Sequence, residues 1–156
     1  MLDAVIIFCG KYLIYIELLA FAGFVLALRA RVRWRFLIMT VIALPLAYLL
    51  GKAASFIWYD PRPFVESGIT PLIAHVADNG FPSDHLLLGG TLAALVMMRS
   101  PRVSIVFWLM AAAIGAARVL AHVHHTVDIL AGAAIGLASA FIAFEVVVLY
   151  PRRRRL

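Results

Sequence analysis

Five long apolar runs constrain this chain more than any other feature of its sequence. They cover roughly residues 4–28, 36–57, 84–98, 103–121 and 127–149. A helix needs about 20 apolar residues to cross the hydrocarbon core of a bilayer, which is about 30 Å thick. Only 14% of the residues are charged, against about 25% in ordinary soluble domains. The sequence therefore predicts an all-α integral membrane protein, with residues 1–156 forming a single domain of about five transmembrane helices.

The arginines indicate how these helices are oriented, because basic residues are enriched on the cytoplasmic side of membrane proteins. They follow the first, third and fifth runs: Arg29, Arg31, Arg33, Arg35, Arg99, Arg102 and Arg152 to Arg155. In a five-span chain these three clusters share one side, so we expect a cytoplasmic C-terminus and an N-terminus outside the cell membrane. The net charge of +6 then reflects loop anchors, and no nucleic-acid partner is expected.

Three polar segments meet at the extracytoplasmic face on this topology: KAASFIWYDPRPF (52–64), GFPSDH (80–85) and ARVLAHVHHTVD (117–128). Arg62 and Arg118 carry planar guanidinium groups that suit bidentate contact with phosphate oxygens. The prolines that flank Arg62 favour an extended backbone there. Ser83 precedes an apolar run and fits a helix N-cap, and free amides behind an N-cap attract anions.

Two histidines in these segments suit acid–base or nucleophilic chemistry. His124 and Asp128 are four residues apart, so they share a face if the last helix begins near them. The carboxylate can then fix the tautomer of the imidazole and raise its basicity, as in an oriented nucleophile or base. His85 falls on the first turn of the third predicted helix, where it can protonate a leaving oxygen.

These residues resemble the signature of the type 2 phosphatidic acid phosphatase superfamily. Its three motifs are Lys-x6-Arg-Pro, Pro-Ser-Gly-His and Ser-Arg-x5-His-x3-Asp, and this chain carries a version of each, in order, over about residues 52–128. The matching residues are Arg62, Pro63, Pro82, Ser83, His85, Arg118, His124 and Asp128. Three ordered motifs are a far more specific signal than any one of them.

The chain departs from the family pattern at three positions. Asp84 replaces the glycine of the second motif and belongs with the expected phosphate-site residues, whereas Ala117 replaces the serine of the third. Ser55 stands where the family has its lysine. The nearest lysine, Lys52, is three residues earlier on roughly the same helical face, from which it can extend into the site.

The resemblance implies a role for each matching residue. His124 is expected to be the nucleophile that forms a phosphohistidine, with Asp128 orienting it and His85 as general acid. Arg62, Arg118 and Ser83 are expected to bind the phosphate. No metal or other cofactor is expected, because the arginines supply the positive charge that a metal ion supplies elsewhere.

Within the superfamily, the short five-span chain and the YDPRPF and FPSDH variants look most like bacterial undecaprenyl pyrophosphate phosphatases. This resemblance implies hydrolysis of the lipid pyrophosphate to the monophosphate at the extracytoplasmic face. Other lipid phosphates stay open as substrates: phosphatidylglycerol phosphate, phosphatidic acid or a lipid A phosphate. A different hypothesis is a small non-enzymatic transporter, which predicts ionisable residues distributed across the bilayer. The oligomeric state is not indicated.

The other polar residues have simpler interpretations. His75, His122 and His125 are expected to be hydrogen-bonded core residues, because none pairs with a partner at a motif spacing, and a metal tract at HVHH is disfavoured. Asp60 and Glu66 are expected to solvate the outer loop. Glu17 lies within the first apolar run, where ionisable residues are costly. We expect it either to support Arg62, Arg118 or Lys52 or to pair with a structural partner such as a tyrosine.

Overall fold

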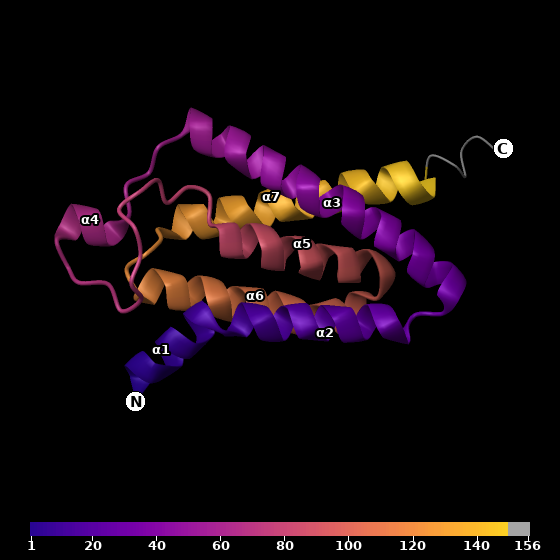
Figure 1. The fold of residues 1–156 in the computed structure, drawn as a ribbon, viewed down its shortest axis with the longest axis horizontal. Helices are drawn as coiled ribbons and strands as arrows, with labels where there is room; N and C mark the ends of the chain where they lie inside the picture. The colour runs from indigo at the N-terminus through magenta and orange to yellow at the C-terminus, as the bar shows by residue number, and fades with distance from the viewer. Residues whose placement is uncertain (150–156) are drawn as a thin grey trace.

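The computed structural model describes residues 1–149 as a bundle of helices, and Figure 1 shows α5 at its centre, with α6 on one side and α7 on the other. Arg152 to Arg155 lie outside the described residues. The helices are α1 (Leu2–Lys11), α2 (Leu13–Ala27), α3 (Ala30–Ile57), α4 (Pro63–Ser67), α5 (Asp84–Arg99), α6 (Pro101–Leu120) and α7 (Thr126–Phe144), which a π-helical turn (Glu145–Leu149) continues.

Several of these helices are apolar enough to cross a membrane. The helices α3 and α6 and the segment Thr126–Val148 each pass by length and composition, and the bent pair of α1 and α2 is a fourth candidate. The helix α5 has 16 residues, so it rises only about 24 Å, less than the thickness of a bilayer core. Residues 1–149 therefore contain helices and no strands, with three or four candidate spans, and the count of five stays a prediction.

The first predicted span is wrong in one respect, because it is two helices rather than one. The axes of α1 and α2 differ by 47° across a break at Tyr12. The Nη1 of Arg118 donates to the Gly10 carbonyl at 3.2 Å, just before this break. Carbonyls in the last turn of a helix have no partner within it, so the break supplies an acceptor for a buried guanidinium group.

The second predicted span begins six residues earlier than expected. Arg31, Arg33 and Arg35 lie in the first turns of α3 rather than in a loop, and of this cluster only Arg29 precedes the helix. Long arginine side chains can carry their charge away from an apolar helix surface, so the cluster does not end the helix. The hydropathy pattern excluded these residues although the backbone there is helical.

Small residues bring α5 and α7 into close contact. A side chain at Gly132 would place its Cβ 2.7 Å from the Ser83 carbonyl oxygen, and one at Gly136 would meet the Thr91 backbone nitrogen at 2.7 Å. Helices that approach this closely gain packing contacts, which drive helix association in lipid. The contact also joins the beginning of α7 to the N-terminus of α5, where the polar segments lie.

A long connection between α3 and α5 folds back over this end of the bundle (Figure 1). Arg62 has extended backbone angles before Pro63 begins α4, as the prolines predicted. The Phe64 amide donates to the His122 carbonyl, and the Leu72 amide donates to that of Ala121. These bonds tie the connection to the turn between α6 and α7.

Candidate active site

His124 and Asp128 are paired, although not in the way their spacing suggested. His124 lies in the turn before α7, not on the helix, because α7 begins at Thr126. Its Nδ1 is nevertheless 3.1 Å from Oδ2 of Asp128. The same oxygen accepts the backbone N–H of His125 at 2.9 Å. The Asp128 side chain is fully buried, so this carboxylate holds both the ring and the turn.

Two arginines face the other nitrogen of the His124 ring. Nη1 of Arg62 lies 3.4 Å from Nε2, and Nη2 of Arg118 lies 3.5 Å from it. A guanidinium group carries only donors, so Nε2 must present its lone pair, and the ring proton belongs on Nδ1 toward Asp128. This tautomer leaves a free nucleophilic lone pair between two positive charges.

Arg62 is held in place by three further acceptors. Its Nε donates to Asp78 at 2.7 Å, and Nη1 donates to the Val123 carbonyl at 2.7 Å. Nη2 lies 3.5 Å from the Asn79 carbonyl. Although partial burial alone would raise it, the hydrogen bond and charge of Arg62 bring the pKa of Asp78 below its ordinary value. Asp78 is therefore ionised and fixes the guanidinium plane.

His85 lies next to Arg118 on the opposite wall. It occupies the first turn of α5, as predicted, and its Nε2 is 3.4 Å from Nη1 of Arg118. The same nitrogen of Arg118 donates to the Gly10 carbonyl, and Nη2 of Arg118 lies 3.5 Å from Nε2 of His124. One buried guanidinium group therefore contacts both histidines. Both histidines also line one cavity, so both can reach a group bound there.

Burial and the arginines favour the neutral form of His124. Burial lowers the pKa of His124, the hydrogen bond from Asp128 opposes this, and the charges of Arg118 and Arg62 lower the pKa further. The resulting pKa lies below the ordinary histidine value. The ring is thus neutral at neutral pH, as a nucleophile requires.

These groups surround a polar cavity of about 280 Å³. Among the predicted site residues, it is lined by Lys52, Arg62, Asp84, His85, Arg118 and His124. Ser83 is the N-cap residue of α5, as predicted, but its hydroxyl makes no capping bond and it is fully buried outside the cavity lining. Its Oγ has no hydrogen-bond partner among the described residues.

Lys52 and Asp84 occupy the rim of the cavity. The ammonium group of Lys52 lies 5.3 Å from the ring centre of Tyr48, and both Lys52 and Asp84 are exposed. Ser55 also lines the cavity, but its oxygens accept hydrogen bonds from Asn79 at 2.9 and 3.1 Å. The position of the family's lysine is therefore used for a structural contact.

The predicted partners of Glu17 are wrong. Its side chain is fully buried, and neither carboxyl oxygen has a hydrogen-bond partner among the described residues. One oxygen would lie 2.8 Å from a Cβ at Gly89. Since Gly89 is one turn from His85, Glu17 packs against α5 below the cavity and bonds none of Arg62, Arg118, Lys52 or a tyrosine.

His75 and His125 are not simple core residues. His75 lines the cavity, and its ring centre is 6.3 Å from that of His124. Burial, and then the charges of Arg62 and Arg118, lower the pKa of His75. His125 contacts Asp60 at 3.0 Å and Glu66 at 3.4 Å. These contacts come from the long connection, so no local sequence pattern predicted them.

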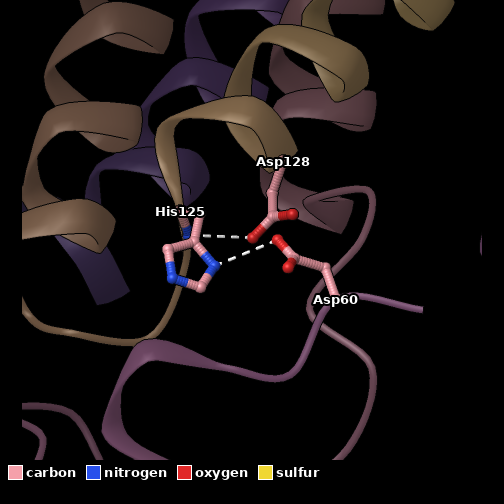
Figure 2. A group of neighbouring side chains, drawn as sticks. All are labelled: Asp60, His125 and Asp128. Atoms are coloured by element: carbon pink, nitrogen blue, oxygen red, sulfur yellow. Dashed lines mark hydrogen bonds and ion pairs between the residues drawn. The ribbon is translucent and has the colours of Figure 1, made fainter. Parts of the chain in front are cut away.

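Asp60, expected to be solvated, is instead packed against α7. Its side chain is 18% exposed, and Figure 2 shows it beside His125 and Asp128. One ligand atom from each of these three residues lies within 4.8 Å of the others, so they could hold a metal ion.

The model of the PAP2 superfamily matches residues 33–152, which include all three motifs. The chain belongs to the PAP2 superfamily. It is 31% identical over 145 residues to the bacitracin transport permease protein BcrC of Bacillus licheniformis, covering 92% of this chain and 71% of that protein. It is 27% identical over 154 residues to undecaprenyl-diphosphatase BcrC of Bacillus subtilis, covering 92% and 74%.

Two solved structures share the fold. LpxE of Aquifex aeolicus superposes with a TM-score of 0.74 at 21% identity, covering 92% of this chain and 86% of that one. A transmembrane PAP2-type phosphatidylglycerolphosphate phosphatase of Bacillus subtilis gives 0.64 at 24% identity, covering 91% and 74%. The family resemblance of the three motifs is thus confirmed.

Proposed function

We propose that this protein hydrolyses a polyprenyl pyrophosphate, such as undecaprenyl pyrophosphate, to the monophosphate through a phosphohistidine on His124. The observation that carries the mechanism is the His124 ring, with Nδ1 on Asp128 and Nε2 between two arginines. A phosphate in the cavity would meet the lone pair of Nε2 and two guanidinium groups at once. Such preorganised charge is often the largest contribution to catalysis.

The reaction has two balanced steps. Nε2 of His124 attacks the terminal phosphorus, the bond to the bridging oxygen breaks, and His85 gives a proton to the departing lipid phosphate. Water then attacks the phosphohistidine, His85 takes a proton from the water, and the P–N bond breaks to release inorganic phosphate. Arg62 and Arg118 stabilise the charge on the transferred group in both steps, and we propose that no metal ion is needed for them.

Two apolar grooves beside the cavity support an amphiphilic substrate. One, of about 300 Å³ between α3 and α5, is lined by Leu44, Ala47, Tyr48, Leu87, Leu88 and Asp84. The other, of about 230 Å³, lies between α2 and α5 and also includes Asp84 and His85. Because both grooves share Asp84 with the polar cavity, a headgroup in the cavity can connect to a hydrocarbon tail along the bundle.

The arginines support a site facing the extracytoplasmic side of the cell membrane. Arg31, Arg35 and Arg99 line a separate cavity, formed by the end of α5 and the start of α3, away from the connection that covers the active site (Figure 1). Cytoplasmic ends of membrane helices carry such residues. The pyrophosphate would then be hydrolysed at the outer leaflet.

The name of one relative supports a polyprenyl substrate, and the place of the site residues at one end of the bundle argues against transport. The Bacillus subtilis relative is named an undecaprenyl-diphosphatase, whereas the Bacillus licheniformis relative is named a transport permease. A transporter needs polar groups along its path, but here the site residues gather at one end of the bundle. Within the described helices, the fully buried Glu17 makes no hydrogen bond that would continue a path.

The test is phosphate release by the purified protein in detergent with EDTA. Undecaprenyl pyrophosphate, phosphatidylglycerol phosphate and phosphatidic acid are compared, with His124→Gln as the inactive variant. A matched control is His122→Asn, since His122 has a φ of +59° that asparagine tolerates and lies outside the cavity lining. We expect turnover that survives EDTA, prefers the pyrophosphate and disappears only in His124→Gln.

Two further outcomes test the assignment. Acid-sensitive, alkali-stable labelling of the native chain by a labelled substrate is expected for a phosphohistidine, and none is expected in His124→Gln. No release from any of the three lipids would refute the proposal and favour transport. A preference for phosphatidylglycerol phosphate would refute the polyprenyl substrate.

A further inference from the structure

A second carboxyl group lies behind the pair of His124 and Asp128. Oδ2 of Asp60 is 3.0 Å from Nδ1 of His125, and the His125 backbone N–H donates to Oδ2 of Asp128 at 2.9 Å. Figure 2 shows the two carboxyl groups turned toward each other, and their facing oxygens lie within 4.8 Å. Asp60, His125, Asp128 and His124 therefore form one continuous polar chain.

The backbone holds Asp60 in this position. The Asp60 amide donates to Oδ1 of Asn79 at 2.9 Å, and its carbonyl accepts the Gly80 amide at 2.8 Å. A Cβ at Gly80 would be 3.1 Å from Oδ2 of Asp128 and 3.2 Å from the Asp60 carbonyl. Glycine thus lets the connection approach Asp128 closely, and Asp60 has little freedom to turn away.

Two neighbouring carboxylates cannot both be ionised without repulsion, so one of the pair favours its protonated form. Burial and the Asp128 carboxyl raise the pKa of Asp60, although the hydrogen bond to His125 opposes this. The other titratable groups around the pair are His125 and Glu66 on its outer side and His124 on its inner side. None of them is a permanent cation.

We propose that Asp60 is a positioning residue for His124, and that Asp60 and Asp128 hold one proton between them. The shared proton keeps Oδ2 of Asp128 turned toward Nδ1 of His124 and relieves the repulsion between the carboxyl groups. Nε2 of His124 then stays aimed into the cavity. This inference rests on the proposed function, since it assigns Asp60 to the same nucleophile.

A proton fits this place better than a metal ion. A divalent cation needs several ligand atoms around it, and Oδ2 of Asp128 already receives the His124 ring and the His125 amide. The other oxygen of Asp128 points away from Asp60 and His125 in Figure 2. A cation would therefore have to displace a bond to His124 or His125.

The test compares Asp60→Ala with Asp60→Asn. The NH2 group of asparagine can take the place of Oδ2 and donate to both Asp128 and Nδ1 of His125, so it imitates the protonated form. We expect Asp60→Ala to lower kcat by about 10–100-fold, as loss of an outer partner does in comparable sites, with KM within about twofold. Asp60→Asn should stay within about threefold of native.

The matched control is Glu66→Gln, because Glu66 contacts the same His125 but is exposed and does not reach Asp128. It should leave kcat unchanged. Native kcat in Asp60→Ala would overturn the proposal. A loss in Asp60→Asn as large as in Asp60→Ala would also overturn it, since an ionised Asp60 would then be required. Thermal unfolding of each variant separates these effects from misfolding.

An infrared measurement tests the proton independently of activity. At neutral pH the native-minus-Asp60→Asn difference spectrum should contain the C=O band of a protonated carboxyl. Its absence, or one equivalent of a bound divalent cation that Asp60→Asn loses, would overturn the shared proton. If the native chain hydrolyses no lipid, the proposed function fails, and this spectrum still decides whether the carboxyl groups share a proton.

Discussion

Gly132→Ala should damage both stability and catalysis, because Gly132 lies on α7 one turn beyond Asp128 and directly against α5. The added Cβ would be 2.7 Å from the Ser83 carbonyl oxygen, 3.0 Å from Leu86 Cβ and 3.1 Å from the Leu87 nitrogen. Two of these three atoms are backbone, so no side chain can simply rotate away. Since carbon atoms prefer separations of about 3.5–4.0 Å, α5 and α7 must move apart by roughly 0.5 Å.

The expected magnitudes follow from this displacement. Overpacking a close contact costs about 1–3 kcal/mol, and alanine regains about 0.5–1 kcal/mol of helix propensity over glycine. The net loss of stability is therefore roughly 0–2.5 kcal/mol. A 1 Å misplacement of reacting groups can cost about 100-fold in rate, so a shift of half that size between Asp128 and His85 should lower kcat about tenfold.

The assay pairs phosphate release with thermal unfolding in the same detergent. Gly23→Ala is the matched control, because Gly23 lies inside α2 and a Cβ there meets nothing within 4 Å. It should be neutral or stabilising, with native kcat. If Gly132→Ala behaved like Gly23→Ala in both measurements, close contact between α5 and α7 would not be what positions the two halves of the site.

Three further predictions concern the cavity. The pKa of His124 lies below its ordinary value and only the neutral ring attacks, so activity should be lost as the pH falls through this lowered pKa. A pH profile of kcat should place the acidic limb below about pH 6.5. An acidic limb at or above that value would contradict the assignment of His124 as the nucleophile. Arg62→Lys should reduce kcat/KM by about 100–1,000-fold in steady-state assays, because one ammonium group cannot reach Asp78, the Val123 carbonyl and the substrate together. A loss of less than about tenfold would argue against this geometry. Lys52→Met should raise KM less than about tenfold without changing kcat, because an exposed charge contributes little; a large fall in kcat would instead assign Lys52 to the transition state.

Hydropathy predicted where the helices lie in the sequence better than it predicted where they break. The third run, 84–98, matches α5, and the fourth, 103–121, matches α6 within two residues. The break at Tyr12 was missed, since a window average is the same for a straight and a bent helix. The carbonyl just before this break accepts a hydrogen bond from Arg118, which is far away in the sequence.

The motif residues were predictable because their spacing is local or follows a family pattern. His124 and Asp128 are four residues apart, and His85 follows the N-cap of α5. Asp60, Asp78 and His75 were missed as site residues, because the fold of the connection rather than a periodic pattern brings them there. In a connection of this length, a side chain reaches its partner through tertiary contacts that no short window contains.

The departure at Ser55 illustrates how tertiary contacts change the meaning of a motif position. Asn79 donates to Ser55 and also to the Trp58 carbonyl at 2.9 Å. Its Oδ1 accepts the amides of Asp60 and Phe81 at 2.9 and 3.0 Å. The Asn79 side chain thus links the end of α3 to two segments of the connection, around Asp60 and Phe81. A lysine at position 55 would lose the hydroxyl contact to Asn79. Through Asn79, Ser55 therefore helps to hold Asp60 behind Asp128.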